Sequence, residues 1–169
     1  MKQKTKINEI IKKYDKVLTI TIIAIIILII LIRAFINMDP INGKMICTYK
    51  TESDKLKSTY KYNIEFKFRK VTYLETYEVI TSEDEELLKE YKESLEMLSS
   101  IYENLKYYNN DIKLKNNSLT TKTKINYSKL DMTEYKKLNP NNPLIKNNKI
   151  SIKDIKKVYE RNGAKCTYK

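Results

Sequence analysis

The sequence of 169 residues has no histidine and no tryptophan, and it contains only two glycines, three prolines and two cysteines. The absence of histidine removes the side chain that most often acts as a general base or a metal ligand near neutral pH. Because Gly43 and Gly163 are far apart, a glycine-rich phosphate loop and a Gly-x-Ser-x-Gly nucleophile elbow are also excluded. We therefore predict no catalytic, cofactor-binding or metal-binding residues, and a protein that is not an enzyme.

The acidic run Glu83 to Glu86 is the segment that would suit acid–base chemistry or metal binding. The start of a helix explains this run better. Ser82 and Glu85 have the spacing of a capping box, and carboxylates near a helix N-terminus face the positive end of the helix dipole. An enzyme with a serine–lysine pair or two carboxylates needs none of the missing residue types, so this alternative stays open.

A long apolar run extends from Val17 to Ile36, and its first sixteen residues carry no charge. At a rise of about 1.5 Å per residue, a helix of twenty residues is roughly 30 Å long, which matches the hydrocarbon thickness of a bilayer. A helix also closes all its backbone hydrogen bonds internally, as lipid requires. We predict one transmembrane helix over residues 17–36, with Arg33 reaching the headgroups.

The charges on the two sides of this run predict its orientation. The segment before it, residues 1–16, carries lysine at positions 2, 4, 6, 12, 13 and 16, whereas Arg33 is followed by no cation before Lys44. Because lysine-rich flanks stay in the cytoplasm, we place residues 1–16 there and the C-terminal segment outside. Bulky residues from Ala34 to Asn37 do not suit a signal peptidase site, so we predict an uncleaved signal-anchor.

The remainder of the chain predicts a linker over residues 37–43 and one α+β domain over 44–169. Strict alternation of apolar and polar residues predicts a half-buried strand over Thr59 to Phe68, after a first strand over Lys44 to Lys50. A turn at Arg69-Lys70 leads to a return strand over Val71 to Ile80. In the second strand, the side chains predicted to face inward are Tyr60, Tyr62, Ile64, Phe66 and Phe68.

Helices and a second hairpin complete the predicted domain. Ser82 caps a long helix that runs to about Tyr107 and packs through the stripe Leu87, Tyr91, Leu95, Leu98, Tyr102 and Leu105. A hairpin follows, with arms at residues 111–115 and 119–128 and Asn116-Asn117 as its turn. Asp131 and Ser151 cap two short helices, with a loop over 139–149 between them. We predict an antiparallel sheet of about five strands packed with one long and one or two short helices.

The two cysteines, Cys47 and Cys166, lie in the first and the last predicted strand. An even number of cysteines outside the cytoplasm favours a disulfide, and two free thiols are the alternative. A cysteine nucleophile is disfavoured because the chain has no histidine to activate it.

The net charge of +12 is concentrated in the C-terminal part of the domain, after the acidic helix. A basic surface there would suit anionic lipid headgroups, a cell-wall polymer or an acidic protein partner. Alternatively, the basic segment and the acidic helix face each other, or the lysines reflect codon bias. We predict no nucleic-acid partner, because the domain is placed outside the cytoplasm.

The order of elements in residues 44–169 resembles the YehR-like family of small bacterial envelope lipoproteins, a domain of unknown function. The common pattern is a strand bearing a cysteine, a Tyr/Phe hairpin, a long Leu-rich helix, a second hairpin and a closing helix. Cys47 lacks the lipobox that precedes the family's lipid-modified cysteine, and the predicted spanning helix would replace that lipid anchor. The resemblance implies an α+β fold and an envelope location, and it implies no activity.

These observations together predict a single-pass membrane protein whose outer domain is a non-enzymatic binding or interaction module of the cell envelope. Two alternatives stay open. The protein could be a membrane-tethered enzyme with an unrecognised site, or a small accessory subunit of a membrane complex that it contacts through the helix over 17–36.

Overall fold

The computed structural model describes residues 21–32 and 39–169. The chain divides into two compact units, Met1–Asp39 and Pro40–Lys169. In the first unit, residues 21–32 form a helix whose isoleucine and leucine side chains are about half exposed. Among the described residues, no helix combines the length and the apolar character that crossing a bilayer requires. Residues 1–20 and 33–38, which include the predicted cytoplasmic tail and both ends of the predicted span, lie outside the described residues. The transmembrane helix stays a prediction.

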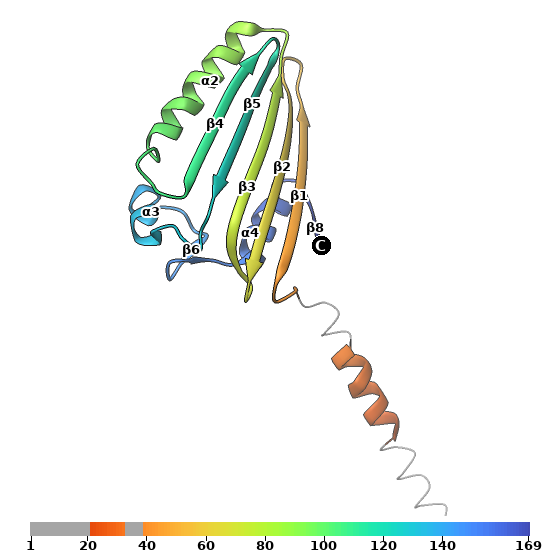
Figure 1. The fold of residues 1–169 in the computed structure, drawn as a ribbon. Coiled ribbons are helices and arrows are strands. Elements are labelled where there is room, and N and C mark those ends of the chain that lie inside the picture. Colours follow the sequence, from red (N-terminus) through yellow and green to blue (C-terminus); the bar gives the residue numbers. More distant parts are fainter. Residues whose placement is uncertain (1–20, 33–38) are drawn as a thin grey trace, which may run out of the picture. The chain divides into compact units, whose positions relative to one another are not determined.

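The second unit is an α+β domain built on one antiparallel sheet (Figure 1). Its strands are β1 (Gly43–Glu52), β2 (Lys57–Lys67), β3 (Lys70–Thr81), β4 (Tyr108–Lys115), β5 (Ser118–Ile125) and β8 (Lys165–Tyr168). They lie in the order β4-β5-β3-β2-β1-β8, and all neighbours are antiparallel. The sheet thus has six strands where the sequence predicts about five, and the last of them is the short segment that bears Cys166. A small ribbon of β6 (Ile145–Lys146) and β7 (Lys149–Ile150) forms in the segment predicted as a loop.

The domain has three helices, α2 (Glu85–Ser100), α3 (Met132–Leu138) and α4 (Ile152–Arg161). The predicted caps of the two short helices are confirmed, since the side chains of Asp131 and Ser151 accept hydrogen bonds from backbone N–H groups of the first turn. The predicted cap of α2 is wrong. Asp84 caps α2, while the Ser82 hydroxyl donates to the Lys55 carbonyl at 2.7 Å and accepts from the Asp84 N–H at 3.0 Å.

The predicted packing stripe of α2 is also partly wrong. Leu88, which lies outside that stripe, is fully buried against Ile80 and Leu119. Leu98, a member of the stripe, is 54 % exposed. Leucines occupy both 87 and 88, so the periodicity alone fits two helix rotations that differ by about 100°. The apolar patch at the end of β3 and β5 selects the rotation that buries Leu88.

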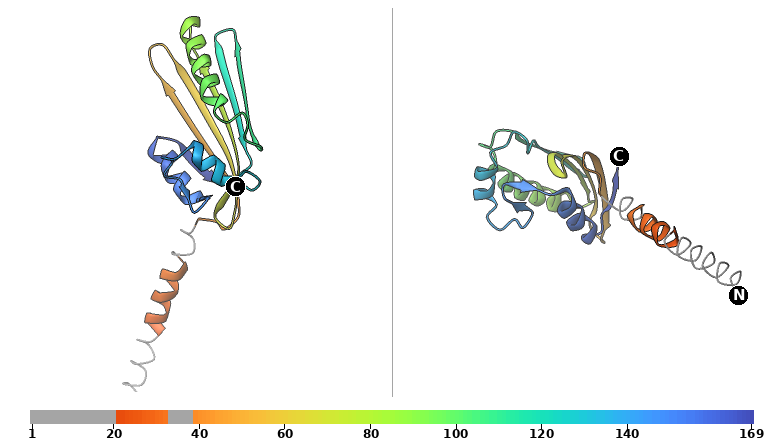
Figure 2. Two further views of the ribbon diagram at one scale, coloured as in Figure 1. Left: turned by 90° about the vertical axis from the view of Figure 1, so that its left-hand side faces the viewer. Right: turned by 90° about the horizontal axis from the view of Figure 1, so that it is seen from below.

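Every buried residue of the six strands lies on one face of the sheet, which we call the inner face. Two apolar clusters cover its two ends. The larger one joins Met45, Ile64 and Leu74 to α4 and the ribbon through Ile152 and Ile150. The smaller one lies beneath α2. The right-hand view of Figure 2 shows the helices gathered on the concave side of the curved sheet, so the opposite, outer face carries no helix.

The β2–β3 turn differs from the prediction as well. Lys67 and Lys70 are register partners, so Phe68 and Arg69 form the turn, and Lys70 already belongs to β3. The alternation predicts that Phe68 faces inward at the end of the strand, but its side chain is 66 % exposed. The alternation of β2 ends at Lys67 because the chain reverses there.

Candidate functional site

The outer face of the sheet is covered by none of the three helices of the domain (Figure 2). One row of register partners crosses it from edge to edge, and each strand contributes one residue. In the order of the strands β8, β1, β2, β3, β5 and β4, the row is Lys165, Thr48, Lys61, Tyr77, Lys122 and Asp111. None of the six is buried, and Tyr77, near the middle, is 42 % exposed.

Lysines outnumber acids on this face, which we call the basic face. Away from the β2–β3 hairpin tip, it carries Lys44, Lys50, Lys57, Lys61, Lys113, Lys115, Lys122, Lys124 and Lys165, against Glu52, Glu65, Glu75 and Asp111. Each of the four acids is already paired with a lysine of the same face. The surplus charge is therefore positive.

Glu75 shows how the acids of the basic face are engaged. Its carboxylate lies 3.0 Å from the Lys122 ammonium and 4.0 Å from that of Lys124. The hydrogen bond from Lys122 lowers the pKa of Glu75, against a smaller opposing effect of burial. Glu75 therefore stays ionised at neutral pH, with its carboxylate between the two lysines.

Four lysines on the same face have no such partner, and three of them lie around Thr48. In the described part of the chain, no carboxylate lies within 4.0 Å of the side-chain nitrogen of Lys115 or of the three around Thr48, which are Lys50, Lys61 and Lys165. Lys61 and Lys165 are the register partners of Thr48 on its two sides, and Lys50 follows Thr48 by two residues on β1. Strand and residue spacings place these three Cα atoms roughly 8 to 10 Å from one another. This triangle concentrates positive charge that no carboxylate among the described residues offsets.

A polar band crosses the middle of the inner face, between the two apolar clusters. It consists of Tyr60, Glu78 and Thr121, which are register partners on β2, β3 and β5. Burial raises the pKa of the Glu78 carboxyl, and a hydrogen bond with Tyr60 partly opposes this. Burial, and then the hydrogen bond with Glu78, raises the pKa of Tyr60 to about 12. The Thr121 hydroxyl is buried and has no hydrogen-bond partner among the described residues.

The polar band offers a single carboxylate among hydroxyls. The titratable group that faces Glu78 in the band is Tyr60, whose pKa is also raised, and the third member, Thr121, does not titrate. Rings of Tyr62 and Tyr159 stack beside it with centroids 4.2 Å apart. We interpret the band as a polar strip that separates the two clusters of the core.

A cavity of about 730 Å³ lies at the loop end of the sheet, beside the start of α2. Glu83 and Asp84 of the predicted acidic run line it, together with Ser53 and Ser82. The Asp84 carboxylate accepts the Leu87 N–H at 3.0 Å, and both serine hydroxyls donate to backbone carbonyls of the β1–β2 loop. These groups connect the loop to the helix, which supports the structural interpretation of the acidic run.

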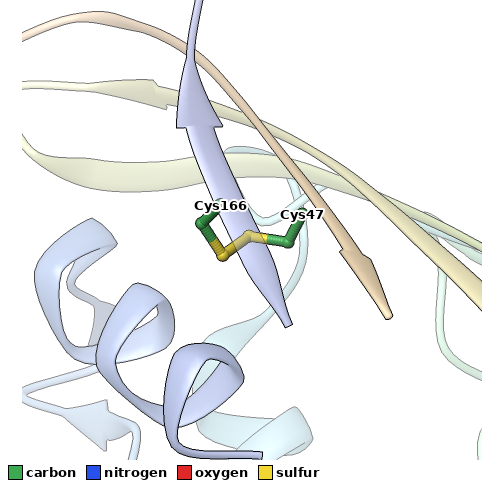
Figure 3. Close-up of a disulfide and its surroundings, with 2 residues drawn as sticks. All are labelled: Cys47 and Cys166. Atoms are coloured by element: carbon green, nitrogen blue, oxygen red, sulfur yellow. A yellow bond between two sulfur atoms is a disulfide. The ribbon is translucent and has the colours of Figure 1, made fainter. Parts of the chain in front are cut away.

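The two cysteines are joined, as the sequence predicts. Cys47 of β1 and Cys166 of β8 are register partners, and their sulfur atoms are bonded across the two strands, next to α4 (Figure 3). Cys47 is fully buried, whereas Cys166 is partly exposed. The disulfide attaches the short edge strand β8, and with it Lys165 of the basic face, to the sheet.

The sequence indicated part of the basic face and missed the rest. Alternation along β2 places Lys61 on the outer side, as predicted. The same alternation could have placed Tyr77 and Lys165 outward, but no local signal predicts that they share one row. That requires the order of the strands, which depends on contacts between distant segments.

No protein-family model and no curated protein matches the chain. Among solved structures, the chain is similar to the NMR structure of E. coli YehR, with a TM-score of 0.53 and 13% sequence identity, over 77% of this chain and 94% of that chain. It is also similar to the NMR structure of a protein from Streptococcus pneumoniae TIGR4, with a TM-score of 0.46 and 17% identity, over 78% of this chain and 87% of that one. The likeness to YehR supports the α+β fold alone. The lipoprotein family that the sequence resembles stays a prediction.

Proposed function

We propose that this chain is a membrane-anchored, non-enzymatic binding module of the cell envelope that holds an anionic envelope polymer on its basic face. The observation that carries the proposal is the triangle of Lys50, Lys61 and Lys165, three exposed lysines without a carboxylate partner among the described residues. A convex sheet face that none of the domain's helices covers suits a long polymer better than a small molecule, which prefers a concave site.

Two features support the location outside the cytoplasm. The apolar run over 17–36 has lysines on its N-terminal side, which favours a cytoplasmic N-terminus. The Cys47–Cys166 bond is typical of an oxidising compartment. We propose a single-pass membrane protein with its C-terminal domain outside.

Binding is tested with the full chain in nanodiscs of neutral lipid. The probes are long-chain inorganic polyphosphate and poly-glutamate, which carry phosphate and carboxylate charges respectively. We expect binding that weakens as salt concentration rises, because the contacts are exposed charges. The triple variant Lys50→Gln, Lys61→Gln, Lys165→Gln is expected to bind about tenfold more weakly, since three exposed charges contribute about 0.5 kcal/mol each.

A control variant removes the same charge elsewhere. Lys89, Lys106 and Lys137 are exposed lysines away from the basic face, and their replacement by glutamine lowers the net charge equally. If both triple variants lose the same affinity, general charge attracts the polymer and the basic face is not the site. Equal binding by the unchanged protein and the Lys50/Lys61/Lys165 variant would also show that the basic face is not the site.

Topology is tested in intact cells with a membrane-impermeant thiol reagent. We expect labelling only after reduction, and at Cys166 before Cys47, because Cys47 is fully buried in the fold. Labelling that requires cell lysis but no reductant would place the domain in the cytoplasm. It would also reject the proposed location without affecting the polymer-binding measurement.

A further inference from the structure

The tip of the β2–β3 hairpin holds two bulky residues in a backbone conformation that such residues avoid. Phe68 and Arg69 have φ angles of 51° and 59°. The left-handed region costs a residue with a side chain about 1 kcal/mol or more, and two-residue hairpin turns normally place Asn or Gly there. This strain persists although Phe68 is largely exposed and contributes little burial to the core. Such a position suggests that the phenyl ring serves a purpose at the tip.

The segment that enters the domain is bonded to the same tip. The Phe68 N–H donates to the side-chain oxygen of Asn42 at 2.8 Å, and the Arg69 N–H donates to the Ile41 carbonyl at 2.7 Å. Ile41 is 55 % exposed. Two large apolar side chains, Phe68 and Ile41, therefore project from one end of the sheet.

A cavity of about 330 Å³ lies directly behind the tip. Lys67, Lys70 and Lys149 line it, and none of the described residues that line it is acidic. Lys67 and Lys70 face each other across the hairpin. Lys149 belongs to β7 of the ribbon. Just after the ribbon, the Ile152 N–H donates to the Arg69 carbonyl at 3.0 Å, which holds the ribbon next to the hairpin tip.

The lysines of this cavity lie close together without a counter-charge. In the part of the chain that the structure describes, none of the three has a carboxylate within 4.0 Å. The neighbouring Lys149 lowers the pKa of Lys70, which is the direction that two adjacent like charges produce. An anion between them would turn this repulsion into attraction, and a phosphate oxygen can accept from two ammonium groups at once.

We infer that this cavity binds the phosphate of an anionic phospholipid headgroup, with Phe68 and Ile41 inserted at the surface of the bilayer. A lipid is favoured over free phosphate because the exposed apolar pair lies beside the cavity, and lysines around apolar side chains suit an anionic membrane surface. Ile41 also follows the apolar run by only five residues, a length of chain that spans at most about 18 Å. The inference rests on the proposed membrane anchor, and it is independent of polymer binding.

The absence of tryptophan makes a direct test available. The variant Phe68→Trp introduces the only tryptophan of the chain at the tip, as a somewhat larger aromatic side chain that can be excited selectively over the tyrosines. The full chain is incorporated into nanodiscs of phosphatidylglycerol with phosphatidylcholine brominated in the upper acyl chain. We expect a blue-shifted emission that the brominated lipid quenches. The matched control is Thr59→Trp, on β2 roughly 30 Å away from the tip, whose emission is expected to stay unquenched.

The role of the lysines is tested on the same reporter. Adding Lys70→Gln and Lys149→Gln to Phe68→Trp is expected to reduce the quenching to the level of Thr59→Trp. The matched pair Lys89→Gln and Lys106→Gln, with the same loss of charge far from the cavity, should leave the quenching unchanged.

Each of the other outcomes overturns the inference. Equal quenching in nanodiscs of neutral lipid alone would show insertion by apolar contact, without a headgroup site. Absence of quenching in both lipids would show that the tip does not touch the bilayer. A third outcome is that inorganic phosphate binds the unchanged protein more tightly than the Lys70/Lys149 variant, while Phe68→Trp shows no quenching. This outcome would assign the cavity to a soluble anion. Failure of the unchanged chain to remain with the nanodisc on gel filtration would instead reject the anchor of the proposed function.

Discussion

Cys47 and Cys166 are separated by 119 positions in the sequence, yet they are register partners on neighbouring strands and form a disulfide. The bond joins the first strand of the domain to its last one. β8 is an edge strand that pairs with β1 alone, through four residue pairs. The disulfide thus secures the element with the fewest other contacts in the sheet.

Reduction of this disulfide is expected to destabilise the domain by up to about 4 to 5 kcal/mol, because it releases a very long loop in the unfolded chain. The measurement is denaturant unfolding of the full chain with and without reductant. The variant Cys166→Ser should behave like the reduced protein in both conditions. An unchanged midpoint on reduction would show that β8 does not depend on the bond.

Replacement of Leu88 by alanine is expected to cost about 2 to 5 kcal/mol, since it leaves a cavity in the fully buried contact with Ile80 and Leu119. Leu98→Ala is the matched control on the same helix, and it should change stability by no more than about 0.5 kcal/mol. Denaturant midpoints of the two variants decide between the observed rotation of α2 and the one that the sequence stripe predicts. The reverse order of the two losses would support the sequence stripe.

The carboxyl of Glu78 on the inner face is expected to make the domain less stable as pH rises. Its pKa is raised in the fold, so the folded state binds more protons than the unfolded chain between the unfolded and the folded pKa. Its contribution is fully present below the unfolded pKa and is lost as pH rises through the folded pKa. Glu78→Gln should therefore flatten this fall and leave the variant at least as stable as the unchanged protein at pH 7. Unfolding measured between acidic and neutral pH checks this, and a steeper fall in the variant would contradict it.

Gly163 follows Asn162, the C-cap of α4, and has a φ of 90°; a Cβ atom there would lie 3.1 Å from the ring of Tyr49. Gly163→Ala combines a left-handed backbone with a tight contact, so we expect a loss of about 1 to 2 kcal/mol. The double variant Gly163→Ala, Tyr49→Phe keeps the aromatic ring beside residue 163. Its loss of stability should be no smaller than the sum of the losses in the two single variants. Thermal or denaturant unfolding gives the values, and a neutral Gly163→Ala would show that the end of α4 can relax.

The local features of the domain were largely predictable from sequence. Strict alternation predicted β2, the caps Asp131 and Ser151 marked the two short helices, and Asn116 marked the turn of the second hairpin. These signals depend on residues within a few positions of one another. The rotation of α2 was not predictable, because Leu87 and Leu88 both fit an apolar stripe and only the sheet distinguishes them.

The candidate surfaces were less predictable than the elements. The sequence by itself determined the excess of lysine, the shortage of catalytic residue types, the apolar run and the alternation that points Lys61 outward. Only the tertiary structure decided that Lys165 and Lys61 flank Thr48, and that Lys149 reaches Lys70 behind the hairpin tip. The physical reason is the distance along the sequence over which each kind of interaction acts. Propensities and alternation act over neighbouring residues, whereas these groupings require segments far apart in the chain to pair in one order, and the free energy of core burial selects that order.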